Sequence, residues 1–163
     1  MATEVDNVLS NMARQVATQE ELKDVKPERI MGMRWILTWK TQDDGTQKGK
    51  ARMVVLGYQH PEQTQLETAS PTISRNSRHM LFATTAIHGF VLEHADASSA
   101  FLQSDETVLK KNIYVRTQPK MAAALGIPAR DAYGAMAKVR KSFYGLTNAP
   151  RTWWNDITKK LAN

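Results

Sequence analysis

The chain has 163 residues, of which 42% are apolar and 23% charged, so it can bury the core of one folded domain and is not compositionally disordered. It contains no cysteine, which excludes disulfides and thiolate metal sites, and no apolar run of the roughly 20 residues that span a membrane. The formal net charge of +6 favours a polyanionic partner such as nucleic acid, although many soluble proteins are similarly basic.

The first part of the chain is predicted to be helical. Its apolar residues recur at three- and four-residue steps, which indicates an amphipathic helix packed by its apolar face. Those residues are Val5, Val8, Leu9, Met12 and Val16. Acidic residues in this segment argue against a transit peptide, and it has no apolar core for a secretory signal. We expect residues 1–28 to form a helical lead-in that ends near Lys26-Pro27.

A β-hairpin is predicted next, over residues 30–58. Residues 31–39 are rich in Trp, Ile, Leu and Thr, and the turn dipeptide Asp44-Gly45 follows them. Residues 51–58 are the expected returning strand. Trp35 and Trp39 share one face of the first strand, where packing is the expected role of both.

The middle of the chain is predicted to form a loop, a helix and a short strand. Residues 60–71 are polar and contain two prolines, as loops do. Residues 74–88 have helical periodicity, and Gly89 follows at the position of a capping glycine. Residues 91–95 are the expected strand, with Asp96 at its end. A carboxylate there suits Mg²⁺, although an acid at such a position is more often a cap.

The last third is predicted to alternate short elements. They are a turn or helix at 97–103, a strand at 113–115, a helical run at 121–125, a strand at 135–143 and a helix from 149 through 157. No internal repeat, low-complexity tract or Ser/Gly linker divides the chain. We therefore expect one folding unit of the α+β class.

Two segments have charge patterns that suit phosphates. Lys50 and Arg52 alternate on one strand face, where they could hold a triphosphate by charge-assisted hydrogen bonds. A solvated strand face is the alternative, and the commoner one. Residues 139–154 interleave basic and aromatic side chains, which suits backbone phosphates and base stacking. The alternative is a core strand, a turn and a helix with incidental charges.

Six blocks of sequence occur in a fixed order along the chain. They are Gly32 with Trp35, Ile36 and Lys40; Lys50-Ala51-Arg52; Glu67 through Pro71; Asp96 through Leu102; Ile113-Tyr114-Val115 with Gln118-Pro119; and Phe143 through Trp153. With these blocks the chain, from about Glu20 to its end, resembles the reverse transcriptase of copia-type LTR retrotransposons. The corresponding motifs of that family read roughly G-x-x-W-V-x-x-x-K, K-A-R, E-T-F-S-P, D-V-x-x-A-F-L, I-Y-M-x-Q-P and L-Y-G-L-K-Q-A-P-R-x-W.

The resemblance implies an α+β chain with the right-hand polymerase fold. Residues 29–163 would form a fingers β-hairpin and an incomplete, truncated ferredoxin-like palm. The family's later Y-x-D-D motif has no counterpart here, because Asp43-Asp44 in the hairpin turn is the only pair of adjacent aspartates. The thumb and RNase H regions have no counterpart either.

The resemblance also implies roles at the catalytic centre. Asp96 would be the catalytic aspartate that binds Mg²⁺, and the backbone carbonyl of Ala97 would help to hold a second ion. Phe101 would be the bulky gate that excludes the 2′-hydroxyl of ribonucleotides. Arg52 would hold the incoming triphosphate, with Lys50 as its helper.

Further roles would lie in the segment before the last helix. Asn148 stands where the family has glutamine and would reach toward the nucleotide with one methylene less. Tyr144, Gly145 and Arg151 would contact the nucleic acid.

The implied function is template-directed DNA synthesis from deoxynucleotides on an RNA or DNA primer–template, inside the cell, in the cytoplasm or nucleus, and without a membrane. One carboxylate cannot hold two divalent ions, so we expect the chain to be inactive alone. The alternative is a domesticated, non-catalytic fragment that binds nucleic acid or serves as a structural subunit of a larger assembly.

Overall fold

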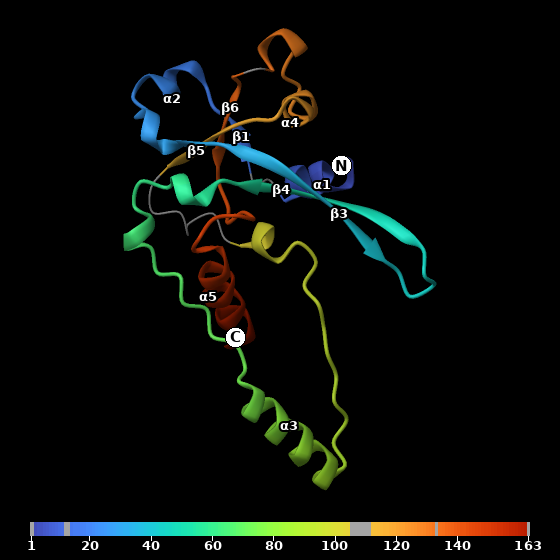
Figure 1. The fold of residues 1–163 in the computed structure, drawn as a ribbon. Coiled ribbons are helices and arrows are strands. Elements are labelled where there is room, and N and C mark those ends of the chain that lie inside the picture. The colour runs from blue at the N-terminus through green and yellow to red at the C-terminus, as the bar shows by residue number, and fades with distance from the viewer. Residues whose placement is uncertain (1, 12–13, 105–111, 133, 163) are drawn as a thin grey trace.

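A computed structural model describes residues 2–11, 14–104, 112–132 and 134–162. The helices are α1 (Ala2–Ser10), α2 (Gln19–Lys23), α3 (Arg75–His88), α4 (Pro119–Ala124) and α5 (Ala149–Ala162). The strands are β1 (Arg14–Val16), β2 (Ile30–Met31), β3 (Met33–Thr41), β4 (Gln47–Val55), β5 (Ile113–Arg116) and β6 (Met136–Val139) (Figure 1). None of the described helices is both long and apolar enough to span a membrane.

The strands form two separate sheets. One has four strands in the order β1-β6-β5-β2, where β2 runs parallel to β5 and the other neighbours are antiparallel. The other is the two-stranded hairpin β3-β4. This mixture of helices with mainly antiparallel sheets agrees with the predicted α+β class.

The core lies where the four-stranded sheet meets the base of the hairpin and the turn before α5. Its fully buried large side chains are contributed by both sheets, by α4 and by the segments before β5 and α5. They include Met31, Met53, Leu102, Val115, Met121, Val139 and Phe143. The hairpin contributes Met33, Met53 and Val55 to this apolar cluster, and all three lie at its base. The hairpin is therefore anchored to the core at that end.

The predicted hairpin is confirmed over residues 33–55, with a register that runs from Met33 opposite Val55 to Thr41 opposite Gln47. Residues 30–31 belong instead to β2 of the other sheet, and the returning strand ends at Val55, before a short 3-10 helix at Gly57–Gln59. Asp44 shapes the turn, because its carboxylate accepts from the backbone N–H and the hydroxyl of Thr46 at 2.9 and 2.6 Å. In Figure 1 the turn end extends away from the rest of the protein.

The predicted helical lead-in over residues 1–28 is confirmed at α1 (Ala2–Ser10) and at α2 (Gln19–Lys23), but it is wrong at residues 14–16. Residues 14–16 are instead the edge strand β1, where Val16 lies opposite Ala137 of β6. Pairing with β6 satisfies backbone groups that a continued helix would have bonded internally, and the apolar spacing alone does not distinguish the two outcomes. Met12 lies outside the described residues.

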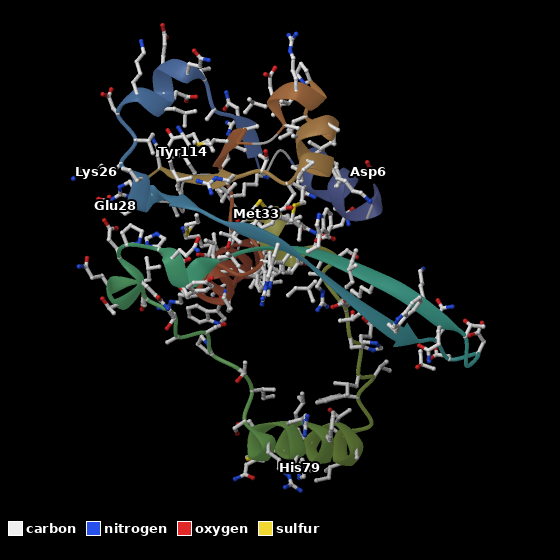
Figure 2. All side chains as sticks on the ribbon, turned by 45° about the horizontal axis from the view of Figure 1, so that its top comes forward. Asp6, Lys26, Glu28, Met33, His79 and Tyr114 are labelled. Atoms are coloured by element: carbon white, nitrogen blue, oxygen red, sulfur yellow. The ribbon has the colours of Figure 1, made fainter. Side chains whose placement is uncertain are left out.

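Helix α3 is confirmed, together with its capping glycine, and Ser74 is its N-cap rather than its first residue. The Ser74 hydroxyl accepts from the N–H of Ser77 at 3.0 Å, and Gly89 ends the helix with a φ of +65°. Its apolar residues, however, do not pack on the core: Met80 and Ile87 are 71% and 79% exposed. Figure 1 shows α3 apart from both sheets, and Figure 2 shows His79 on this separate helix.

The predicted strand at 91–95 is wrong. These residues have no strand partner, and Val91 is 86% exposed. A strand needs a neighbour for its backbone N–H and C=O groups, and no described strand lies beside this segment. Asp96 therefore follows an unpaired stretch of chain rather than a strand end.

The later elements are confirmed with small shifts in their bounds. A short 3-10 helix covers Ala100–Gln103, β5 and α4 lie close to the predicted positions, and β6 is shorter than predicted. Helix α5 begins at Ala149 with Pro150 in its first turn, the position that proline tolerates.

Candidate functional site

The rings of Phe101 and Tyr144 meet edge to face, with centroids 5.1 Å apart. The two residues are far apart in the chain, and a fully buried neighbour holds each of them. Leu102 anchors the short helix that carries Phe101, and Phe143 anchors the turn that carries Tyr144. Both rings therefore sit at the edge of the core, packed against it but partly exposed.

Charges from three segments act on the phenol of Tyr144. Burial raises the pKa of Tyr144, and the negative charges of Glu4 and Asp96 act in the same direction, whereas the positive charge of Arg52 opposes them. The Ser99 side chain, like Arg52, acts to lower the pKa of Tyr144. The charges of Arg52 and Asp96 thus both act on Tyr144, although no hydrogen bond or ion pair among the described residues joins either side chain to it.

The backbone between Asp96 and Phe101 bends sharply at Ser99. Its φ of +52° is the one positive value at a non-glycine residue in the described part of the chain. The bend returns the chain through hydrogen bonds from Leu102 N–H to the Ser99 carbonyl, 2.8 Å, and from the Gln103 amide to the Ser98 carbonyl, 2.6 Å. Left-handed backbone at a serine is uncommon and costs free energy, which makes Ser99 a candidate positioning residue that the sequence did not reveal.

The hairpin is joined to the Tyr144 turn through the backbone. The N–H of Val55, the last residue of β4, donates to the Tyr144 carbonyl at 2.8 Å. Gly145 follows with a φ of +92°, and a β-carbon at this position would overlap the Val55 carbonyl oxygen. The strand that carries Arg52 therefore has a fixed relation to Tyr144.

Lys50 and Arg52 lie exposed on one face of β4. The register of the hairpin places Arg34, Lys40 and Lys48 on the same face. None of these five cations forms an ion pair with a described acidic residue. Of these five cations, Arg52 is the one that acts on the pKa of Tyr144. Lys50 lies two residues earlier on the same strand, closer to the hairpin turn.

Arg151 has intramolecular partners. Its guanidinium binds the Glu67 carboxylate at 2.7 Å and the Ala69 carbonyl at 3.2 Å, and it lies 4.8 Å from the centre of the Trp154 ring. The side chain is 22% exposed. Arg151 thus fastens residues 67–69 to α5, a contact that neither sequence block indicated.

Asn148 lies at the start of α5, where its carbonyl accepts from the N–H of Thr152 at 2.9 Å. This backbone bond belongs to the first turn of the helix and leaves the side-chain amide half-buried beside the Tyr144 turn. Among the described residues, no hydrogen bond joins Asn148 to Arg52 or Asp96.

Asp96 and Ala97 are both exposed. Within the described ranges no group of three or more His, Cys, Asp or Glu side chains could hold a metal ion. One carboxylate and one backbone carbonyl are fewer donors than two Mg²⁺ ions need, so the described residues do not by themselves fit a two-metal centre.

Comparison with known proteins identifies the relatives of this chain. The family described as "Reverse transcriptase (RNA-dependent DNA polymerase)" matches residues 17–163. Two similar proteins are the retrovirus-related Pol polyproteins from transposons RE1 and RE2 of Arabidopsis thaliana, 33% and 32% identical over 81% of this chain. A third, from transposon TNT 1-94 of Nicotiana tabacum, is 30% identical over 79% of it.

The matched region is a small part of these relatives. It spans 8% of the RE1 polyprotein and 9% of the other two. No solved structure matches the chain. The predicted resemblance to copia-type retrotransposon enzymes is confirmed, and members of the matched family generally use Mg²⁺. The chain belongs to the reverse transcriptase (RNA-dependent DNA polymerase) family.

Proposed function

We propose that Arg52, Asp96, Phe101 and Tyr144 form the nucleotide-binding side of a polymerase site. In this proposal the β3-β4 hairpin is the fingers and the four-stranded sheet is part of the palm of a right-hand polymerase fold. The observation that carries the proposal is the edge-to-face contact of Phe101 with Tyr144, a phenol on whose pKa the charges of Arg52 and Asp96 also act.

Each of these groups suits one part of a deoxynucleoside triphosphate. Arg52 is exposed and has fork-shaped donors that match phosphate oxygens. The Phe101 ring, held against Tyr144, has the bulk to exclude a 2′-hydroxyl. Lys50 adds positive charge beside Arg52, and the Ala97 carbonyl and the Asn148 amide are secondary candidates for the same ligand.

The Tyr144–Gly145 turn and Arg151 are the proposed nucleic-acid side of the site. Because the guanidinium of Arg151 already binds Glu67, we propose that it acts mainly by holding residues 67–69 in place. The primer–template would then meet the turn and the cations of the hairpin.

We further propose that the 163-residue chain binds these ligands but does not extend a primer by itself. It supplies one carboxylate at the site, and phosphoryl transfer on two metal ions needs more. Purified chain, incubated with primer–template, deoxynucleotides and Mg²⁺ or Mn²⁺, should yield no longer product. Template-dependent extension would refute this part of the proposal.

The catalytic assignment is tested in a completed domain, in which a segment that carries Y-x-D-D is fused after Asn163. Asp96→Asn should reduce primer extension on the order of a thousandfold or more and leave primer–template affinity unchanged. Asp131→Asn removes the same charge from an exposed position in another part of the chain and is the matched control. Asp96→Asn with full activity would show that Asp96 only shapes the local turn.

A second substitution in the same domain tests the role of Phe101. Phe101→Ala should selectively increase incorporation of ribonucleotides, because the ring next to Tyr144 is the proposed barrier to the 2′-hydroxyl. Unchanged discrimination between ribo- and deoxynucleotides would remove Phe101 from the site.

A further inference from the structure

The outer half of one hairpin face is uncovered. Trp35, Leu37 and Trp39 share this face. Trp35 packs against the core, but Leu37 is 61% exposed and Trp39 is 78% exposed. The predicted packing role is therefore confirmed for Trp35 and wrong for Trp39, because the strand extends beyond the core that covers its base.

The indole of Trp39 lies across the opposite strand. Its cross-strand partner is Gly49, and a β-carbon there would be 3.6 Å from Cζ3 of the indole. With no side chain at that position, the ring can rest on the backbone of β4 and keep its other surface open. A hollow of about 360 Å³ lies beside it, lined by Leu37, Trp39, Gly49 and Ala51 among others.

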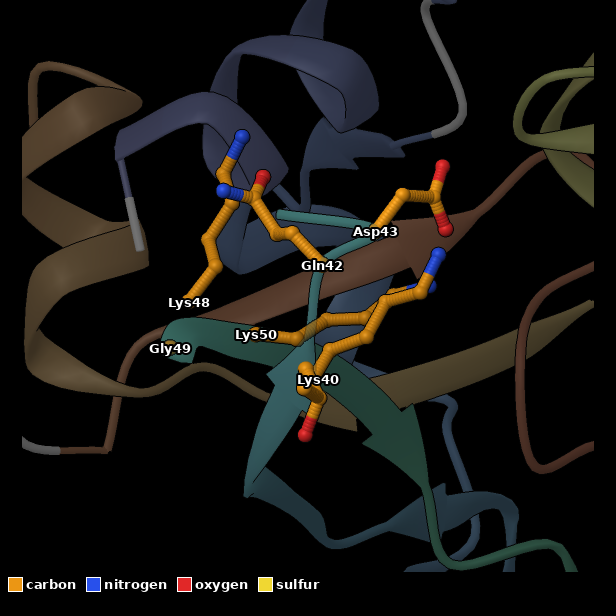
Figure 3. A pocket seen from close by; sticks show the side chains of 7 residues that line it. Lys40, Gln42, Asp43, Lys48, Gly49 and Lys50 are labelled. Carbon is orange, nitrogen blue, oxygen red and sulfur yellow. The ribbon is translucent and has the colours of Figure 1, made fainter. Parts of the chain in front are cut away.

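The opposite face of the same hairpin is cationic. It carries the five unpaired cations named above, and Lys40, Lys48 and Lys50 line a second hollow of about 370 Å³ with Gln42 and Asp43 (Figure 3). The two acids of the hairpin, Asp43 and Asp44, lie in its turn, and Asp44 already accepts from Thr46. The hairpin thus combines an exposed ring on one face with an excess of positive charge on the other.

This combination matches one class of ligand. A polyanion with flat apolar groups can use both the cations and the open ring, and single-stranded nucleic acid has a base for every phosphate. A blunt duplex keeps its bases stacked internally, so it offers the phosphates alone.

We propose that Trp39, supported by Gly49, is a base-stacking platform for single-stranded nucleic acid on the fingers hairpin. The ligand is the unpaired template strand, and that identification rests on the proposed polymerase function. Lys40 and Lys48, which lie nearest the turn on the opposite face and are separate from the proposed triphosphate ligands Lys50 and Arg52, bind the phosphates of the same strand where it passes around the end of the hairpin.

The test measures anisotropy of fluorescein-labelled oligothymidylate, an abasic oligomer of the same length and a blunt duplex, each with the full chain at low salt. Trp39→Ala should weaken oligothymidylate binding roughly 5- to 150-fold, the range for loss of stacking on one base. It should leave the abasic oligomer and the duplex unaffected. Trp39→Phe should retain most of the affinity, since a ring remains.

Salt dependence separates stacking from charge. Trp39→Ala should leave the slope of log affinity against log salt unchanged, whereas Lys48→Gln should reduce it by about 0.7. Ile87→Ala is the matched control, because Ile87 is 79% exposed but lies on α3. It should change neither affinity nor slope.

The proposal would be overturned if the folded wild-type chain did not bind oligothymidylate at low salt, or if Trp39→Ala bound it with the same affinity as the wild type. It would also be overturned if Trp39→Ala lost as much affinity for the abasic oligomer as for oligothymidylate. An equal loss for an oligoglutamate peptide would point to a protein partner and would also overturn it. None of these results depends on Asp96 or on catalysis, so the platform and the proposed polymerase site can fail separately.

Discussion

Gly57 and Gly145 meet backbone to backbone. A β-carbon added to Gly57 would overlap the carbonyl oxygen of Gly145, and one added to Gly145 would overlap that of Val55. Neither obstacle is a flexible side chain that could move aside. The close approach seats the end of the β3-β4 hairpin on the Tyr144 turn, and only glycine at both positions permits it.

Gly145→Ala should therefore destabilise the protein by about 2–4 kcal/mol, because the overlap adds to the strain of a left-handed backbone. Gly134→Ala is a matched control: its φ is +93°, against +92° for Gly145, but nothing lies within 4 Å of the added carbon. The control should lose only about 1–2 kcal/mol. Urea denaturation measures both, and equal losses would mean that the close approach is relaxed in solution.

Arg151 and Glu67 should be coupled energetically. Arg151→Gln and Glu67→Gln should each destabilise the protein, and a double-mutant cycle should give a coupling of about 0.5 kcal/mol, since Glu67 is largely exposed and water screens the pair. Limited proteolysis should cut residues 61–74 faster in Arg151→Gln. Arg130→Gln, which breaks a longer and more exposed pair with Asp131, should change neither property.

The phenol of Tyr144 should report on the proposed site. Its folded-state pKa is raised above the ordinary value of 10, so its contribution to stability is complete below pH 10 and is lost as pH rises through the folded pKa. Asp96→Asn removes a negative charge and should lower the pKa of Tyr144, whereas Arg52→Gln removes a positive charge and should raise it.

Ultraviolet titration, compared with Tyr144→Phe, assigns the transition among the four tyrosines of the chain. Arg78→Gln, on the separate helix α3, is the control and should leave the pKa of Tyr144 unchanged. If Asp96→Asn or Arg52→Gln also leaves it unchanged, those groups do not share the environment of Tyr144.

The apolar residues of α3 and the segment after it should promote self-association. Met80, Ile87 and Val91 are 71%, 79% and 86% exposed, and neighbouring exposed apolar side chains favour contact between molecules. Ile87→Gln with Val91→Thr should reduce the associated fraction in sedimentation velocity at a given concentration. Leu161→Gln, which changes an 81% exposed residue at the end of α5, should have little effect. A monomeric wild-type chain at high concentration would contradict the prediction.

Local chemistry in the sequence was sufficient for much of the fold. Asp44-Gly45 specifies the hairpin turn, and Ser74 and Gly89 specify the ends of α3, because each acts on backbone groups within a few residues. The ordered blocks were likewise sufficient for the family, since they depend on residue identity and not on contacts.

Contacts between distant segments decided the rest. Residues 91–95 have the composition of a strand but no neighbour to bond, and residues 14–16 form a strand because β6 lies beside them. Arg151 likewise pairs with Glu67, a residue distant in the sequence. Trp39 is exposed because the core that covers Trp35 does not extend to the outer half of the hairpin. The sequence named Arg52, Asp96 and Phe101 as candidates, but only tertiary packing sets the Phe101 ring against Tyr144 and joins the strand that carries Arg52 to the same turn, because such contacts require proximity in space.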